Sequence, residues 1–383
     1  MKKNIPYLQG LRGIAAFYVV LFHGVDKMVY HGDRITHLIP FFGDWLLFGH
    51  LSVVVFIVIS GYVIGLGTLK NNQLPGGFFS FIKRRAKRIL FPYYPALILS
   101  VPFWILGEQL KGHSIKTIDL IEDFFSHVFL VHDLTNGTMW SINGPMWSVA
   151  VEWQIYFIFA LGLIPIAKKY GANFAVIIAF LIGSILPTIN HAFVLAPNYI
   201  LGSACTWFIG LFGFGWFAAS VVHSKNNVPK FFKDNDLMKY ISIMLIAICG
   251  IISLSIYIRL PTYLSYLPDT ILGLACMTLF IYLGNLSKEG RTSRIISVLT
   301  AKPVMWLGII SYSLYLISGP ILDVSTLFIE NFPINGWEMI ILQYGIVVPL
   351  ILLLSHRFYL LFEKPSISSS SIIVNEKVKK KAS

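Results

Sequence analysis

The sequence predicts an all-α protein that crosses a membrane several times. Hydrophobic residues make up 56% of its 383 residues, and charged residues only 13%. The mean hydropathy is +0.72, whereas a soluble domain carries about twice this share of charge. Because lipid leaves backbone groups no water to bond, we expect apolar spans to form helices. The predicted fold is a polytopic integral membrane bundle of about ten helices in a cell (inner) membrane.

Ten stretches of the chain are long and apolar enough to span a bilayer. The first contains Arg12 and lacks a small-residue cleavage site, which favours a retained helix over a signal peptide. In chain order the stretches cover about 8–29, 51–69, 89–106, 145–167, 172–190, 200–222, 238–258, 268–286, 303–322 and 337–362. Together they predict one transmembrane domain over residues 1–365, followed by a Ser/Lys-rich tail over 366–383.

One interval, residues 117–131, does not fit a transmembrane helix. It is amphipathic but too short to span the bilayer. We therefore expect a re-entrant or interfacial helix there.

The positions of the charges predict the topology. A net charge of +12 would suit a nucleic-acid partner, but lysines and arginines gather in every second loop. The intervening loops are rich in acids. This is the positive-inside pattern, and it predicts ten spans with both termini cytoplasmic. An error of one span would break the alternation from that point on.

The cysteines and loop histidines give no metal or disulfide signal. The three cysteines lie inside apolar stretches, without a metal or disulfide spacing. His31, His37 and His50 in the first outer loop have no compact ligand spacing, so no metal site is predicted. The next outer loop has three more histidines, which we interpret as ordinary surface or interfacial residues. They are His113, His127 and His132.

Two polar residues, Arg12 and His23, interrupt the first predicted helix. Eleven positions separate them, so at about 100° per residue both fall on one stripe, about 16 Å apart along the axis. Such residues within lipid are costly unless they face a polar cavity. An arginine that reaches the interface and a histidine bonded to a neighbouring helix are the alternatives, and they remain open.

Glu152 lies in the fourth predicted span. If this helix enters from outside near Pro145, Glu152 is about 10 Å below the outer surface, nearly at the depth of His23. A carboxylate beside an imidazole fixes its tautomer and stabilises its protonated form, as activation of a hydroxyl requires. Glu152 and His23 are therefore candidates to meet in one cavity.

Several side chains near Glu152 are weaker candidates. Ser148, Glu152 and Tyr156 recur at i, i+4 and i+8 and lie on neighbouring faces of one helix. Trp147 lies beside Ser148. Hydrogen bonding between helices and an aromatic belt at the interface explain Trp147, Ser148 and Tyr156 better than a functional role would. Glu152 differs, because a carboxylate within the membrane is a functional candidate by default.

A basic cluster precedes the third predicted span. Arg85 and Arg88 share a helix face at i, i+3, and Arg12 is expected at a similar depth. Arginines bind phosphate through bidentate contacts, so a cradle for a phosphorylated cytosolic ligand is one interpretation. Contact with anionic lipid is the other, and it suits Lys83 and Lys87 better.

Six ordered segments resemble those of the acyltransferase-3 membrane proteins. They cover nearly the whole chain, and the first holds Arg and His in the spacing of that family. The segments are LQGLRGIAAFYVVLFHG, FIVISGYVIG, RRAKRILFPYY, GPMWSVAVEWQIYF, SYSLYLISGPI and FEKP.

The resemblance implies an O-acyltransferase. Cytosolic acetyl-CoA would be the co-substrate, with no permanently bound cofactor. A hydroxyl of an extracytoplasmic polysaccharide or its lipid-linked precursor would accept the group, for example the O-antigen of lipopolysaccharide. Polysaccharide-assembly proteins are further candidate partners. The acyl group can be acetyl, succinyl or another short acyl.

The resemblance also implies roles for single residues. Arg12, Arg85 and Arg88 would bind the donor. His23 would be the base or a transient acyl carrier, with Glu152 as its partner. The supporting residues would be Trp147, Ser148, Tyr156 and Tyr315.

Two departures from the family pattern stand out. Ser318 occupies a position where many relatives have histidine. Some relatives carry an extracytoplasmic hydrolase-like domain, whereas this chain ends about 20 residues past its last predicted helix. We therefore expect it to complete the transfer itself or to pass the group to a separate protein.

A transporter or flippase with a charged solute path is the alternative function. The sequence has neither a Gly-rich nucleotide loop nor a Gly-x-Ser-x-Gly motif. It shows no convincing internal repeat, which argues modestly against an inverted-repeat transporter.

Overall fold

A computed structural model describes residues 5–31, 46, 48–192, 205–223, 228–259, 266–330, 332 and 336–367. Over these ranges the chain is helical and contains no strand. Eight segments are long and apolar enough to cross a membrane, which confirms a polytopic helical membrane protein. They are Pro6–Asp26, Leu51–Thr68, Gly77–Leu110, Gly144–Tyr170, Asn235–Ser253, Leu267–Lys288, Lys302–Ile329 and Gly336–Ile367.

Two further apolar helices occupy the remaining predicted spans. They are α9 (Ala172–Ala192) and α11 (Phe208–His223), and residues 200–204 before α11 lie outside the described ranges. The count of ten spans and the cytoplasmic position of the termini stay predictions. Of the expected tail over 366–383, only residues 366–367 are described, and they continue the last helix.

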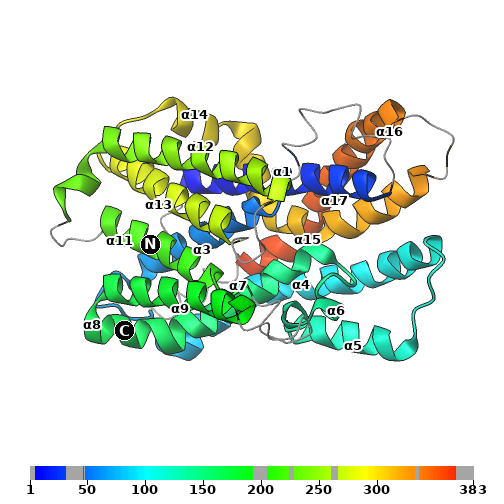
Figure 1. Cartoon of the computed structure of the whole chain (residues 1–383), viewed down its shortest axis with the longest axis horizontal. Coiled ribbons are helices and arrows are strands. Elements are labelled where there is room, and N and C mark those ends of the chain that lie inside the picture. The colour runs from blue at the N-terminus through cyan, green and yellow to red at the C-terminus, as the bar shows by residue number, and fades with distance from the viewer. Residues whose placement is uncertain are drawn as a thin grey trace, which may run out of the picture.

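The helices run mostly along one common direction (Figure 1). The first half contains α1 (Pro6–His31), α3 (Leu51–Thr68), α4 (Gly77–Leu110), α5 (Thr117–Val128), α6 (Asn136–Met139), α7 (Trp147–Ile158) and α8 (Ile164–Tyr170). After α9 and α11 come α12 (Asn235–Arg259), α13 (Leu267–Lys288), α14 (Arg294–Leu299), α15 (Lys302–Glu330), α16 (Gly336–Leu342) and α17 (Val348–Phe358).

The bundle has two chemically different ends. At the basic end, α4 begins with the cluster 83–88, while α8 and α13 finish with lysines. Asn72, after α3, donates to the carbonyl of Ala167 in α8, and Lys288 donates to the carbonyl of Val222 in α11, so these helices finish side by side. At the opposite end α3, α11 and α13 begin.

Glycines bring the central helices into backbone contact. A Cβ on Gly13 of α1 would collide with the backbone of Gly308 in α15, and one on Gly61 of α3 would collide with the carbonyl of Phe212 in α11. Lipid gives little hydrophobic drive for helix association, so close van der Waals packing between small residues supplies much of it. The α1–α15 contact is the most extensive in the bundle and fixes the position of Arg12.

Helix α4 is longer than the sequence pattern predicted. The expected span was 89–106, but the helix covers Gly77–Leu110 and retains Pro92, Pro95 and Pro102 within it. Lysine and arginine are good helix formers, so the basic cluster continues the helix toward the basic end. Arg85 and Arg88 are therefore fixed on one rigid element.

Two other prolines follow a π-helical turn. Pro165 comes after Phe159–Leu163, and Pro349 comes after Gln343–Val347. Proline lacks an amide donor and crowds the preceding turn, and a wider turn accommodates both effects. The helices therefore continue through these prolines.

Helix α5 turns its polar side inward. Asp123 and His127 are buried, whereas Ile118, Ile121 and Phe125 are exposed. An outward apolar face suits contact with lipid, which favours the re-entrant interpretation of this segment. In Figure 1, α5 returns from the far end of α4 toward the middle of the molecule.

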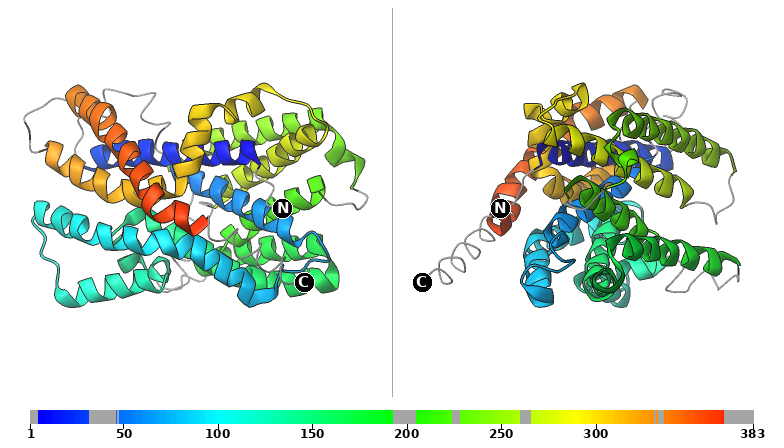
Figure 2. Two further views of the ribbon diagram at one scale, coloured as in Figure 1. Left: turned by 180° about the vertical axis from the view of Figure 1, so that it is seen from behind. Right: turned by 90° about the vertical axis from the view of Figure 1, so that its left-hand side faces the viewer.

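Hydrogen bonds show how far α5 returns along α4. Tyr93 donates to the carbonyl of His127, and Tyr94 donates to that of Val128. Tyr93 precedes the end of α4 at Leu110 by about 25 Å along the helix axis. The chain that follows α5 therefore starts well inside the bundle. Figure 2 shows the same arrangement from behind and from one side.

The glycine contact between α1 and α15 gives a testable prediction. Gly308→Ala should lower the thermal unfolding midpoint in detergent, because overpacking costs about 1–3 kcal/mol. Gly250→Ala is the matched control, since a Cβ on Gly250 in α12 meets nothing within 4 Å. Alanine there should leave the midpoint unchanged or raise it. Equal midpoints for the two variants would contradict the packing argument.

Candidate active site

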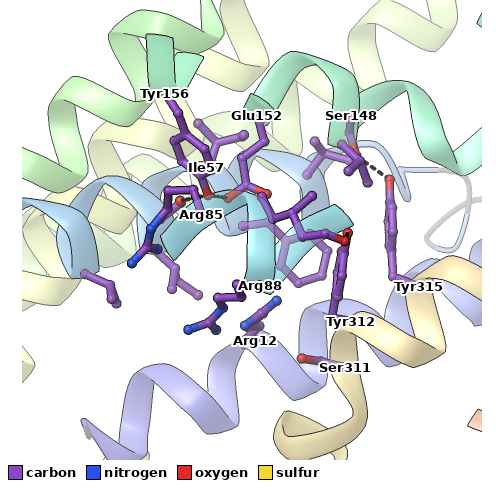
Figure 3. A pocket seen from close by; sticks show the side chains of 17 residues that line it. Arg12, Ile57, Arg85, Arg88, Ser148, Glu152, Tyr156, Ser311, Tyr312 and Tyr315 are labelled. Atoms are coloured by element: carbon purple, nitrogen blue, oxygen red, sulfur yellow. Dashed lines mark hydrogen bonds between the residues drawn. The ribbon is translucent and has the colours of Figure 1, made fainter. Parts of the chain in front are cut away.

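Five helices, α1, α3, α4, α7 and α15, surround one pocket (Figure 3). Its space, open mouth included, is about 800 Å³. The lining residues are Arg12, Val53, Phe56, Ile57, Ile59, Ser60, Val63, Arg85, Arg88, Ile89, Ser148, Val149, Glu152, Tyr156, Ser311, Tyr312 and Tyr315.

Three arginines supply positive charge to this pocket. The structure brings Arg12 of α1 together with Arg85 and Arg88 of α4. The guanidinium carbon of Arg85 lies 5.9 Å from the ring centres of both Phe81 and Tyr156. Its buried Nε has no hydrogen-bond partner. An anionic ligand would therefore satisfy groups that the described residues leave unsatisfied.

Glu152 is the acidic residue of the pocket lining. The hydroxyl of Tyr156, one helical turn later on α7, donates to Glu152 Oε1 at 2.5 Å. Ser60 Oγ lies 3.1 Å from the same hydroxyl and can donate to it. Ser60, Tyr156 and Glu152 thus form a hydrogen-bond chain from α3 to the carboxylate, and the i, i+4 spacing predicted its second link.

The structure places Glu152 in the pocket with the arginines. The sequence pattern placed Glu152 level with His23, but Glu152 lines the pocket together with Arg12, and His23 is not among the lining residues. The segment between α5 and α7 is the physical reason. Asn143 donates to Ser100, about 15 Å before the end of α4. Helix α7 therefore begins deep in the bundle and carries Glu152 toward the basic end.

His23 lies farther along α1, toward the opposite end. Its ring centre is 4.7 Å from that of Phe22. A Cβ on the next residue, Gly24, would lie 3.0 Å from the hydroxyl of Tyr344. Tyr344 in turn donates to the carbonyl of Leu21. His23 and Arg12 thus occupy two separate environments of one helix.

Ser148 and Tyr315 join α7 to α15 at the pocket wall. Their hydroxyl oxygens are 2.6 Å apart, and Tyr315 donates to the carbonyl of Pro145. Ser148 therefore donates to Tyr315. Trp147 does not line the pocket, and its ring stacks on Phe208 of α11 at 5.8 Å.

The SYSLYLISGPI and FEKP segments meet at α15, and Tyr312 of the first segment lines the pocket. Tyr312 donates to the carbonyl of Ile89 in α4. Ser318, at the family's frequent histidine position, is buried, and its hydroxyl has no hydrogen-bond partner among the residues that the structure describes. Glu363 of the FEKP segment accepts bonds from the amide and hydroxyl of Ser313 and so ties the last helix to α15.

Two histidines expected near the surface are buried. The rings of His127 and His132 stack with centres 3.8 Å apart and planes 9° apart, and both side chains are inaccessible. Burial lowers the pKa of His127 to about 4 and that of His132 to about 3. Burial also raises the pKa of Asp133 to about 6, while Gln154 donates to its carboxylate.

This imidazole pair supports the segment that leads into α7. Asn143, in that segment, donates to Ser100 of α4 and to the carbonyl of Leu316 of α15. The start of α7 is thus held from both sides.

No group of three His, Cys, Asp or Glu residues within the described ranges is placed to hold a metal, and His37 lies outside those ranges.

The family model described as an acyltransferase domain, Acyl_transf_3, matches residues 5–357 of the chain. The chain belongs to the acyltransferase-3 family. This membership confirms the resemblance seen in the six segments. It also favours acyl transfer over the transporter or flippase alternative.

Relatives of the chain are named as O-acetyltransferases. The chain is similar to a peptidoglycan O-acetyltransferase, OatA, of Listeria monocytogenes, with 23% identity over 89% of this chain and 53% of that protein. It is also similar to an O-acetyl transferase of Shigella phage Sf6, with 28% identity over 34% of this chain and 39% of that protein. The chain thus spans about half the length of the Listeria protein. No solved structure matches the chain.

The buried imidazole pair gives a prediction about pH. An unfolded histidine takes up a proton near pH 6.5, but folded His132 does so only near its lowered pKa of about 3. Wild-type protein should therefore lose stability from this group as pH falls below 6.5. His132→Gln removes the proton uptake by this histidine on unfolding. The free energy of unfolding of the variant, relative to that of wild type, should therefore rise by up to about 1.4 kcal/mol per pH unit on acidification.

Thermal unfolding in detergent between pH 7 and pH 5 measures this difference. Asp123 and Asp133 remain in both proteins, so their opposing titration largely cancels in the comparison. His113→Gln, at an exposed histidine, is the control and should track wild type. A constant offset between His132→Gln and wild type at every pH would contradict the prediction.

Proposed function

We propose that this protein is a membrane O-acyltransferase of the cell inner membrane. It transfers an acetyl or other short acyl group from cytosolic acyl-CoA to a hydroxyl of an extracytoplasmic polysaccharide or its lipid-linked precursor. The observation that carries the proposal is the pocket in which three arginines from two helices meet. The names of the relatives, which specify O-acetyl transfer, support the reaction type.

The arginine pocket suits the anionic part of the donor. Acyl-CoA carries several phosphate groups, and guanidinium groups bind phosphate through paired hydrogen bonds. Arg12, Arg85 and Arg88 lie on two helices that are rigidly packed against α15. The site is therefore preformed, and acyl-CoA acts as a co-substrate rather than a resident cofactor.

Glu152 belongs to the donor side in this proposal. Its neighbours in the pocket are the arginines, and Tyr156 links it to Ser60 and lies beside Arg85. A single carboxylate among three cations offsets part of their charge and leaves the pocket positive. Glu152 thus remains a candidate catalytic group, but not as the partner of His23.

His23 is the proposed base. In direct transfer its imidazole accepts the proton of the sugar hydroxyl, whose oxygen attacks the thioester carbonyl. The C–S bond then breaks, and the CoA thiolate leaves and is protonated. A covalent acyl-imidazole is the other route, in which the same group passes through His23.

The separation between Arg12 and His23 suits this division of labour. About 16 Å of helix α1 separates them. In acyl-CoA a long, flexible arm joins the phosphates to the thioester. Phosphates bound at the arginines can therefore accompany a thioester that reaches the opposite end of the bundle.

Deleting the gene should remove one ester from the envelope polysaccharide. Mass analysis should show the loss of one acyl group per modified sugar, and the mass difference identifies the group as acetyl, succinyl or another acyl. Restoring the gene with His23→Ala should not restore the ester, although the variant is inserted at the wild-type level. Movement of solute without any new ester would favour the transporter alternative, and normal acylation by His23→Ala would contradict its role.

The arginine pocket makes a second kinetic prediction. Arg88→Ala should raise the KM for acetyl-CoA about tenfold or more, since a hydrogen bond to a charged group is worth about 1.5–3 kcal/mol. The KM for the acceptor should change little. Lys87→Ala is the matched control because Lys87 neighbours Arg88 but does not line the pocket. An unchanged KM for acetyl-CoA in Arg88→Ala would contradict the donor assignment.

A further inference from the structure

A second polar group lies at the opposite end of the bundle, outside the arginine pocket. His50 precedes α3, Trp207 precedes α11, and Asp269 lies in the first turn of α13. Nε2 of His50 is 3.3 Å from Asp269 Oδ1, and the indole N–H of Trp207 donates to Asp269 Oδ2 at 2.9 Å. Three residues that are remote in the sequence therefore meet around one carboxylate.

Burial in this group is uneven. The side chain of Asp269 is 3% exposed, whereas that of His50 is 50% exposed. Within the described residues, Oδ1 of Asp269 is buried and has no polar contact apart from the 3.3 Å approach of His50. A purely structural tie would be expected to satisfy this oxygen and to cover the imidazole. Instead the group presents an accessible ring backed by a buried charge.

Aromatic rings extend from this polar group to the start of α7. Trp207 contacts Tyr266 and Phe208 at ring-centre distances of 6.3 and 5.5 Å, and Phe208 stacks on Trp147. Trp147 in turn contacts Trp140, which is 60% exposed. Phe208 and Trp147 are buried, so they support the half-buried indole of Trp207 from behind. That indole lies beside hydrogen-bonding groups, the combination that binds the apolar face and the hydroxyls of a sugar ring.

The group also lies close to both parts of the proposed reaction site. Val53, which lines the arginine pocket, is one helical turn from His50, a rise of about 4.5 Å. A Cβ on Gly49 would collide with the ring of Phe22, the residue before His23. His50 is thus within reach of the pocket wall and of the outer part of α1.

We propose that His50, Asp269 and Trp207 form the acceptor subsite, which binds a pyranose ring of the extracytoplasmic glycan. This inference rests on the proposed function. The carboxylate of Asp269 orients the Nε2 side of the imidazole and leaves Nδ1 to accept a hydrogen bond from a sugar hydroxyl. Trp207 fixes the carboxylate and offers its ring to the sugar.

Steady-state kinetics of the full chain in detergent tests this proposal. The donor is acetyl-CoA, and the acceptor probe is envelope polysaccharide purified from the gene-deletion strain. His50→Ala and Asp269→Asn should each raise the KM for this polysaccharide about tenfold. The KM for acetyl-CoA should stay within twofold of wild type.

His113→Ala is the matched control. His113 is also an exposed histidine paired with a carboxylate, since its Nδ1 lies 2.9 Å from Oε2 of Glu108. It follows the end of α4, away from the three helices that form the proposed subsite. Its removal should change neither KM.

The possible results distinguish failure of the proposed function from failure of the acceptor subsite. Wild-type protein that transfers no acyl group to the polysaccharide overturns the proposed function itself. Wild-type transfer with an unchanged acceptor KM in His50→Ala, or with a loss confined to kcat, overturns only the acceptor subsite.

A milder variant covers the case in which these substitutions prevent folding. Trp207→Phe keeps a six-membered aromatic ring and removes the pyrrole part of the indole, including the N–H that donates to Asp269. It should raise the acceptor KM while the thermal unfolding midpoint stays near that of wild type. A wild-type acceptor KM in this folded variant overturns the role of Trp207 and the subsite built on it.

Discussion

The confinement of three guanidinium groups and one carboxylate inside a membrane bundle is the constraint on which the rest of this structure depends. Charges are expensive in lipid, so they persist only where protein surrounds them and a polar space receives them. Close glycine contacts between α1 and α15 hold Arg12 at this space, and one continuous helix holds Arg85 and Arg88. Because positive charge exceeds negative charge in the lining, the pocket is best completed by an anionic ligand.

The re-entrant segment decides which acid meets these arginines. Helix α5 buries a polar side and exposes an apolar side, so it returns into the bundle instead of leaving it. The stacked His127 and His132, together with Asn143, then fix the start of α7 deep in the bundle. Glu152 consequently faces Arg12. Had α7 begun at the far end of α4, the same residue would lie near His23.

The sequence could predict what depends on spacing within one helix. Apolar length predicted the spans, and the i, i+4 spacing predicted that Tyr156 and Glu152 are neighbours. It could not predict the depth of α7 or the stack of two histidines, because both depend on packing between segments. The sequence could not predict the cluster of His50, Trp207 and Asp269 for the same reason, because the residues come from the beginnings of three separate helices.

The two polar regions of the bundle suit different ligands. At the arginine pocket, buried cations meet a carboxylate that tyrosine and serine hold in place, an arrangement suited to binding phosphate. At the opposite end, a half-exposed imidazole, a buried carboxylate and aromatic rings suit a neutral, hydroxylated ligand. His23 lies on α1 beyond the first region and next to a residue that packs against Gly49 of the second. Under the proposed function, an acyl group delivered along α1 would meet its acceptor where the second region begins, beside the carboxylate of Asp269 rather than that of Glu152.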